Sequence, residues 1–366
     1  MRVNPKYPLY IPSKGRWESR LTHKTLTGLK VPHYVVVEEQ EYKKYKETLS
    51  DFATILVLDR KYQEDYDACD DFGMTKSKGP GPARNFIWDH SISQSAGWHW
   101  VMDDNISHFA RLHNTQKIRV SDGTIFRCME DFCERYENVS MAGPNYAMFA
   151  PLANNTGNFP PFILNTRIYS CNLIRNDVPF RWRGRYNEDT DLSLQMLKAG
   201  WCTVQFYAFL QHKMGTQTMK GGNTEEFYAK EGTRFKSEMQ VRLHPDVSRL
   251  IWRFRRIHHY VDYTSFKKNM LKRKKDAIPL TEKDDYGMRL VKLRGVEEDA
   301  AVDSGIGPRK EDAGKNAGGR RSKRKEIRLD TRSKGDDDSL SAGGVFVERI
   351  GSRRIRGKKD SEEANK

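Results

Sequence analysis

Trp98–Met102 is an apolar run that stops abruptly at Asp103, Asp104 and Asn105, and no other stretch constrains the fold more. Such a run predicts a buried strand. Open α/β sheets bind their ligands at the carboxyl ends of the strands, and clustered oxygen side chains there suit Mg²⁺ or Mn²⁺ bridging a diphosphate. The same three residues are also good turn formers. On its own, the stretch leaves a metal site and a polar turn as equal alternatives.

Short apolar runs alternate with helical patterns along the chain, and this alternation predicts a parallel sheet with helices on its faces. The expected strands comprise residues 7–11, 34–37, 54–58 and 98–102, and the helices between them comprise residues 18–29, 39–49 and 83–93. Farther along, the patterns predict a hairpin over 117–126 closed by Asp122-Gly123, a helix over 129–137, and strands over 162–171 and 202–209.

The segment 249–261 predicts an amphipathic helix, because apolar residues recur there at helical spacing. Its polar face would carry a basic stripe with an aromatic end, formed by Arg249, Arg253, Arg256 and Tyr260. The stripe suits a surface that tracks phosphates, although a plain solvated face is the alternative. The net charge of +15 favours a polyanionic partner such as nucleic acid.

The composition changes near residue 300 to Gly, Ser, Asp, Lys and Arg, which predicts a disordered basic tail. Apolar residues make up only 37% of the chain, as expected when part of it does not pack. We therefore expect a globular domain over 1–265, a charged helical extension or linker over 266–307, and the tail over 308–366.

Cysteine usage and hydropathy predict a cytoplasmic protein. The five cysteines are scattered and form no Cys-x-x-Cys pair, which predicts reduced thiols and no zinc site. The first residues lack the apolar core of a signal peptide, and no run approaches the roughly 20 apolar residues of a membrane span. We therefore expect no membrane contact.

Glu188, Asp189 and Asp191 follow a run of arginines and aromatic residues and precede a helical pattern. Acids at a helix start complement the helix dipole, and Asn187 or Asp189 could simply be a cap. The alternative is a general base that faces a substrate hydroxyl. A cap needs only one such residue, so the cluster of three favours the general base.

Three further stretches carry candidate site residues. The loop 12–16 could cradle a nucleotide with its backbone amides and cations, or could be a basic turn. The loop 76–85 enters a helix and would favour an anion there, or is an ordinary helix start. His212 follows a strand-like run, where a histidine either completes a metal site or has a structural role.

These motifs together resemble the GT-A fold glycosyltransferases. The resemblance rests on Ile-Pro-Ser-Lys-Gly-Arg at 11–16, Gly-Pro-Ala-Arg-Asn at 81–85, Asp-Asp-Asn at 103–105, Asn-Glu-Asp-Thr-Asp-Leu at 187–192, and His212. More narrowly, residues 7–265 resemble the TET-associated glycosyltransferases of bacteriophages. The resemblance implies an α/β fold of GT-A type: a Rossmann-like mixed sheet flanked by helices, followed by a C-terminal helical segment and a disordered tail.

The resemblance also implies roles for individual residues. Asp103 would contact the donor, and the implied metal ligands are Asp104, Asn105 and His212. Asp189 matches the catalytic carboxylate, with Glu188 as its rival. The implied nucleotide-side residues are Ser13, Lys14, Arg16, Glu38 and Arg84. This chain departs from the family's DxD element at Asn105, and a neutral amide binds a hard cation more weakly than a carboxylate does.

The implied activity is transfer of a hexose from a nucleotide-sugar, a UDP-sugar by expectation, to a hydroxymethylated pyrimidine such as 5-hydroxymethylcytosine in DNA. Mn²⁺ or Mg²⁺ would stabilise the departing diphosphate, while Asp189 takes the proton of the attacking hydroxyl. This single displacement inverts the anomeric centre, and retention stays an alternative.

Two other functions also stay open. One is a non-catalytic nucleic-acid-binding protein with a degenerate nucleotide-sugar fold, and the other is a transferase acting on protein or glycan. The expected location is the cytoplasm, that of the host if the chain is phage-encoded.

Overall fold

Ten strands form one mixed sheet in the part of the chain that the structure describes. The structure is a computed structural model, and it describes residues 4–73, 77–113, 116–150, 160–214, 234–253 and 255–277. The chain divides into two units, Met1–Leu293 and Arg294–Lys366. All described residues belong to the first unit, so the predicted tail and most of the predicted extension lie outside them.

The parallel strands lie together at one side of the sheet. β1 (Leu9–Pro12) pairs in parallel with both β2 (His33–Val37) and β4 (Trp98–Met102), and β2 pairs in parallel with β3 (Ala53–Val57). These four strands confirm the predicted βαβα pattern. The full order is β3-β2-β1-β4-β9-β7-β10-β5-β6, with β8 beside β10.

The other half of the sheet is mixed. β9 (Cys171–Arg175) runs antiparallel to both β4 and β7 (Val139–Tyr146), whereas β10 (Cys202–Lys213) runs parallel to β7. Antiparallel partners complete it: β5 (Ile106–His113), β6 (Gln116–Arg119) and β8 (Phe162–Leu164). The predicted mixed α/β sheet is thereby confirmed.

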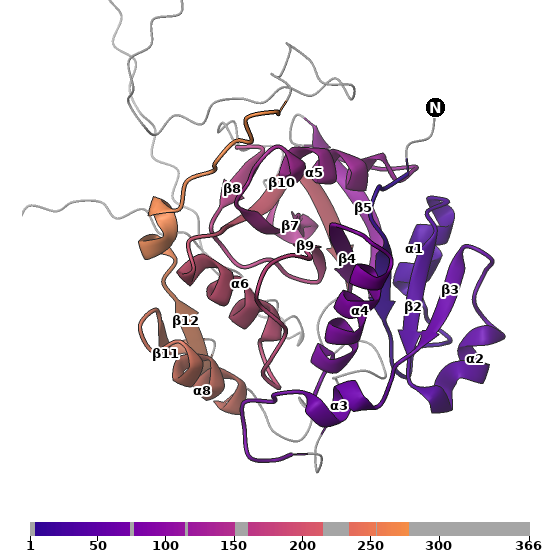
Figure 1. Ribbon diagram of the computed structural model, residues 1–366, viewed down its shortest axis with the longest axis horizontal. Helices are drawn as coiled ribbons and strands as arrows, with labels where there is room; N and C mark the ends of the chain where they lie inside the picture. The colour runs from indigo at the N-terminus through magenta and orange to yellow at the C-terminus, as the bar shows by residue number, and fades with distance from the viewer. Residues whose placement is uncertain are drawn as a thin grey trace, which may run out of the picture. The chain divides into compact units, whose positions relative to one another are not determined.

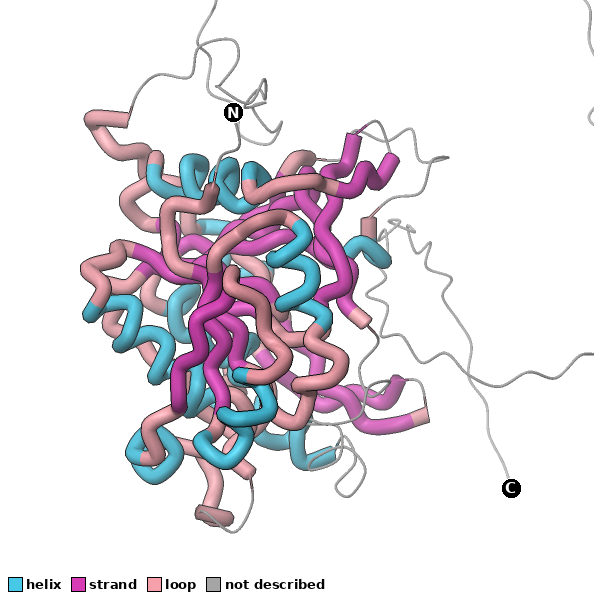
Figure 2. Tube along the Cα trace, turned by 90° about the vertical axis from the view of Figure 1, so that its right-hand side faces the viewer, coloured by secondary structure: helices cyan, strands magenta, loops and turns pink. Residues whose placement is uncertain are grey.

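Alternating side chains of the strands build a core on each face of the sheet. Leu9 and Ile11 pack in the core that includes α1 (Leu21–Gly28) and α5 (Thr124–Glu134), while Tyr10 packs in the core that includes α4 (Gly81–Ser93) and α6 (Glu188–Lys198). Figure 1 shows α4 and α6 in front of the sheet, and Figure 2 shows helices on both sides of the strands.

Shorter helices complete the described structure. They are α2 (Tyr42–Lys46), α3 (Lys61–Asp65), α8 (Arg234–Leu243) and the 3₁₀ turns η1 (Glu39–Glu41), η2 (Ala147–Phe149) and η4 (Thr264–Lys268). Helix α8 packs against the two-stranded sheet of β11 (Ser248–Arg253) and β12 (Arg256–Val261).

The helix predicted over 249–261 is wrong, because these residues form the β11–β12 hairpin. Arg249 pairs with Tyr260 and Arg253 with Arg256 across the antiparallel ladder. Arg255, in the turn, adopts a positive φ of 57° that a helix does not allow. The segment is rich in β-branched and aromatic residues, and cross-strand pairing decides the outcome for such residues.

Two smaller predictions also differ from the structure. The residues 124–126 belong to α5 rather than to a hairpin, because the Asp122 side chain accepts a hydrogen bond from Thr124 N at 3.0 Å and the helix begins there. The strand predicted over 162–171 is two strands, since the chain turns at Asn165 and Ser170, which both have positive φ.

Candidate active site

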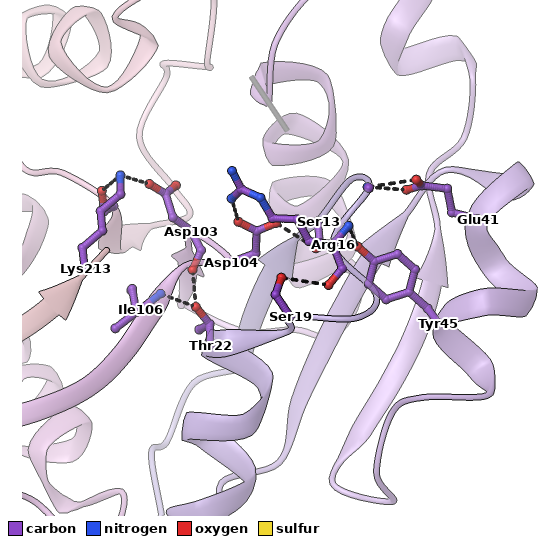
Figure 3. A network of polar contacts seen from close by, with 12 residues as sticks. Ser13, Arg16, Ser19, Thr22, Glu41, Tyr45, Asp103, Asp104, Ile106 and Lys213 are labelled. Carbon is purple, nitrogen blue, oxygen red and sulfur yellow. Dashed lines mark hydrogen bonds and ion pairs between the residues drawn. The ribbon is translucent and has the colours of Figure 1, made fainter. Parts of the chain in front are cut away.

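The residues that follow β4 form a turn whose backbone is held by α1. Asp103 N donates to Ser170 O at 2.7 Å, and Thr22 Oγ1 donates to Asp103 O at 2.6 Å while accepting from Ile106 N at 2.9 Å. Figure 3 shows the contacts of Thr22 with Asp103 and Ile106. The turn and the functional interpretations of this stretch are therefore compatible, because the turn fixes the two carboxylates.

The two carboxylates of the turn point apart. In Figure 3, Asp103 points toward Lys213 of β10, and Asp104 points toward Ser13 and Arg16 of the β1–α1 loop. The two adjacent carboxylates therefore lie in two different environments. One lies beside the start of α6, and the other lies beside the loop predicted to hold a nucleotide.

Asp103 is held by two cations. Its Oδ1 lies 2.9 Å from Arg84 Nη2, and its Oδ2 lies 2.7 Å from Lys213 Nζ. Burial raises the pKa of Asp103, but Lys213 and Arg84 together outweigh burial and hold it well below its usual range. Asp103 is therefore a fixed negative charge under all ordinary conditions.

Arg84 joins this cluster to the start of α6. Its side chain is only 4% exposed, its Nη1 lies 2.9 Å from Glu188 Oε1, and its guanidinium stacks 4.5 Å from the ring centre of Trp182. The fork of a guanidinium can bind two carboxylates at once, which an ammonium does with less precision. Arg84 thus connects the end of β4 with the first turn of α6.

Glu188 and Asp189 are partly buried carboxyl groups at the first turn of α6. Burial, together with the neighbouring charge of Asp189, raises the pKa of Glu188 to about 7 against the pull of Arg84. Burial also raises the pKa of Asp189. A carboxyl group with a raised pKa is a competent proton acceptor near neutral pH.

The helix-cap interpretation does not apply to Asn187, whereas Asp189 Oδ1 accepts a hydrogen bond from Thr190 N at 2.8 Å in the first turn. Asn187 occupies the cap position in a left-handed conformation and makes no side-chain cap bond; it donates instead to Lys236 O at 2.8 Å. Asp191 is fully buried and structural, with His244 Nε2 2.7 Å and Arg183 Nε 3.1 Å from its carboxylate. Glu188 and Asp189 remain as the candidates for chemistry.

Among the predicted nucleotide-side residues, Ser13 and Arg16 contact Asp104, whereas Arg84 contacts Asp103. Ser13 Oγ donates to Asp104 Oδ2 at 2.8 Å, and Arg16 forms an ion pair with the same carboxylate. Lys14 Nζ lies 3.3 Å from Glu38 Oε1. This loop is thus preformed, with its cations held in place by acids rather than left to solvent.

The predicted metal ligands have different surroundings, and Asp104 contacts Ser13 and Arg16. His212 stacks on His108 with ring centres 3.7 Å apart, and burial lowers its pKa to about 4. Asn105 Oδ1 is buried without a hydrogen-bond partner. Across the described ranges, no three His, Cys, Asp or Glu side chains are grouped to hold a metal ion. Because Asp103 and Asp104 are each paired with cations, the residues present do not fit a divalent metal.

Several residues beside these carboxyls were missed by the sequence analysis. Lys213 is the last residue of β10, and the sequence analysis selected its neighbour His212 instead. Arg167 lies 5.0 Å from the ring centre of Tyr169, and Tyr169 Oη lies 3.2 Å from Thr190 Oγ1. No sequence signal singled out this aromatic and basic group beside α6.

The predicted nucleic-acid contacts Arg249, Arg253 and Arg256 lie on the β11–β12 hairpin, in a sheet of its own. The hairpin is anchored on the second half of α6, because Leu194 and Leu197 of that helix share an apolar cluster with Val247 and Val261. The first turn of α6 therefore contains the candidate carboxylates, and its second half packs against the hairpin.

The mixed sheet flanked by helices, with carboxyls and cations at the ends of its strands, agrees with the GT-A type of fold expected from the sequence. The sequence model of the TET-associated glycosyltransferase family matches residues 7–222, more than half of the chain. The chain belongs to this family and is a glycosyltransferase. No curated protein matches the sequence. In the described part of the chain, no helix has the length and apolar character needed to cross a membrane.

Proposed function

We propose that this glycosyltransferase moves a sugar from a nucleotide-sugar, with a UDP-sugar as first candidate, to the hydroxymethyl group of a pyrimidine in DNA. One observation carries the proposal: Arg84 joins Asp103, at the end of β4, to Glu188, at the start of α6. Cations that suit a diphosphate and carboxyls that suit a proton acceptor therefore share one site.

Asp189 is the proposed general base. In the reaction, the oxygen of the acceptor hydroxyl forms a bond to the anomeric carbon while the bond from that carbon to the diphosphate oxygen breaks. The hydroxyl proton passes to Asp189, and the electron pair leaves with the diphosphate. A single displacement of this kind inverts the anomeric centre. Glu188 is the weaker candidate, because its carboxylate already pairs with Arg84.

The cations of the cluster stabilise the departing diphosphate. Arg84 and Lys213 are held in position before the substrate arrives, so no reorganisation is needed as charge develops on the leaving group. Ser13, Lys14 and Arg16 offer hydroxyl, amide and cationic groups to the nucleoside side of the donor.

The β11–β12 hairpin is the proposed DNA contact. Arg253 and Arg256 pair across the ladder and place two basic residues side by side, which suits a polyanion. Trp252 is 72% exposed, which suits stacking on a base. A DNA acceptor places the reaction in the cytoplasm, that of the host if the chain is phage-encoded.

Transfer assays with matched acceptors test this function. The protein is incubated with radiolabelled UDP-sugars and with duplexes that carry either 5-hydroxymethylcytosine or plain cytosine at one position. Label on the hydroxymethylated duplex alone supports the proposal. Label only on added protein or free glycan assigns a different acceptor, and DNA binding with no turnover of any donor contradicts catalysis.

A further inference from the structure

Lys213 places a positive charge beside the carboxylate of Asp103, at the end of β4. It is the last residue of β10, and the pairing with β5 changes register between His212 and Lys213. Its Nζ donates to Asp103 Oδ2 at 2.7 Å and to Ser170 Oγ at 2.8 Å. Its side chain is 18% exposed. Placing a lysine this deep costs desolvation energy, which its partners offset.

Two cations, Arg84 and Lys213, lie on the carboxylate of Asp103. Asp103 contributes one negative charge, and Arg84 and Lys213 contribute one positive charge each. Glu188 offsets Arg84 only when it is ionised, and burial, together with the charge of Asp189, raises the pKa of Glu188 to about 7. A divalent cation at Asp103 would meet two cations already on the carboxylate oxygens and would have to displace them.

The other oxygen ligands near this turn are also committed. Asp104 accepts from Ser13 and pairs with Arg16, and His212 stacks on His108. A metal would have to break these contacts before it gained ligands. Asn105, a neutral amide where the family pattern has an acid, compensates little for that loss.

We propose that Lys213 and Arg84 take the place of a divalent cation and bind the donor diphosphate directly, so that the protein binds its donor without metal. The inference rests on the proposed nucleotide-sugar donor. An ammonium has three N–H donors. Within the described residues, Asp103 and Ser170 accept two of them, which leaves the third for a phosphate oxygen.

Calorimetric titration of the full chain with UDP tests the inference. Wild-type protein in EDTA binds UDP with the same Kd as in Mn²⁺. Lys213→Met weakens this binding about ten- to hundredfold, the loss expected for a charge-assisted hydrogen bond. Lys213→Arg restores most of the affinity. Lys198→Met, which removes a lysine that pairs with Asp246 at 2.7 Å on the surface, leaves the Kd unchanged.

Two results overturn the inference while the transferase function stands: UDP binding that requires Mn²⁺, or Lys213→Met protein that stays folded and binds UDP as tightly as wild type. The wild-type comparison decides the metal question even if Lys213→Met fails to fold, which thermal melting reports. If neither UDP, CDP, GDP nor ADP binds with or without Mn²⁺, the nucleotide-sugar proposal itself fails, and the inference fails with it.

Discussion

Arg84 Nη1 lies 2.9 Å from Glu188 Oε1, so a residue of α4 positions the first turn of α6. The other terminal nitrogen of Arg84 holds Asp103 at 2.9 Å. Because one guanidinium pairs with both carboxylates, it holds Asp103, on the proposed donor side, at a fixed position relative to Glu188, on the proposed acceptor side. The protonation of Glu188 and Asp189 can therefore be used to test the proposed acid–base chemistry.

We predict that Glu188→Gln shifts the acidic limb of the pH profile of kcat/KM toward lower pH. Burial, followed by the charge of its neighbour, raises the pKa of Glu188, and burial raises that of Asp189. A base with a raised pKa is protonated and inactive at acidic pH, and activity appears as pH rises through that pKa. Removing the charge at 188 lowers the pKa of Asp189. An unmoved limb would show that Asp189 is not the titrating base.

A second prediction concerns stability. Asp191→Ala leaves the buried His244 and the half-buried Arg183 without their partner, which costs about 3 kcal/mol in the free energy of unfolding. Urea denaturation at pH 7 measures this change. Val247→Ala, a smaller change at a partly buried site near the same helix, serves as the control and costs less. Equal losses in the two variants would contradict a special role for the buried ion pair.

The same aspartate predicts a pH dependence of stability. Burial alone would raise the pKa of Asp191, but His244 and Arg183 outweigh it and lower the pKa. A depressed folded-state pKa stabilises the fold above the unfolded pKa of about 3.9, and this contribution is lost as pH falls through the folded value. Asp191→Asn should therefore flatten the decline of stability below about pH 4. An unchanged decline would assign it to other carboxyls.

A further prediction distinguishes the contributions of base stacking and of charge to DNA binding by the β11–β12 hairpin. Trp252→Ala should weaken duplex DNA binding about five- to a hundredfold, and Trp252→Phe should retain most of it, because stacking contributes about 1–3 kcal/mol per base. Arg253→Gln should lower the slope of log affinity against log salt by about one. Fluorescence anisotropy over a range of salt concentrations measures both. Ile118→Ala, at another exposed apolar residue, is the control, and an equal loss there would contradict a hairpin interface.

The strand ends were predictable from the sequence because hydrophobic runs and the polar residues that follow them are local signals. Asp103 lies at such an end, Glu188 lies at the start of α6, and the two meet in the structure through Arg84. Lys213 is the last residue of β10, but its role depends on the pairing of that strand and on the position of Ser170. Those are long-range relations that spacing along the chain does not reveal.

The hairpin shows where periodicity misleads. Leu250, Ile257 and Val261 fit a helical repeat, yet the pairing of Ser248 with Val261 starts a ladder that runs to the turn. Packing of the hairpin against α8 and α6 decides between the two structures. The basic character of the segment was recognised correctly, whereas the strand conformation that exposes Trp252 was not.

The most direct test of the central claim is nucleoside mass spectrometry of 5-hydroxymethylcytosine DNA after incubation with a UDP-sugar and either wild-type or Asp189→Asn protein. The account predicts a glycosylated nucleoside with wild type. It predicts about a 10²- to 10⁴-fold lower yield with the variant, although the variant binds UDP normally in calorimetry. Glycosylation that is undiminished in Asp189→Asn, or modified DNA that is bound while no nucleotide-sugar is ever consumed, would contradict the account.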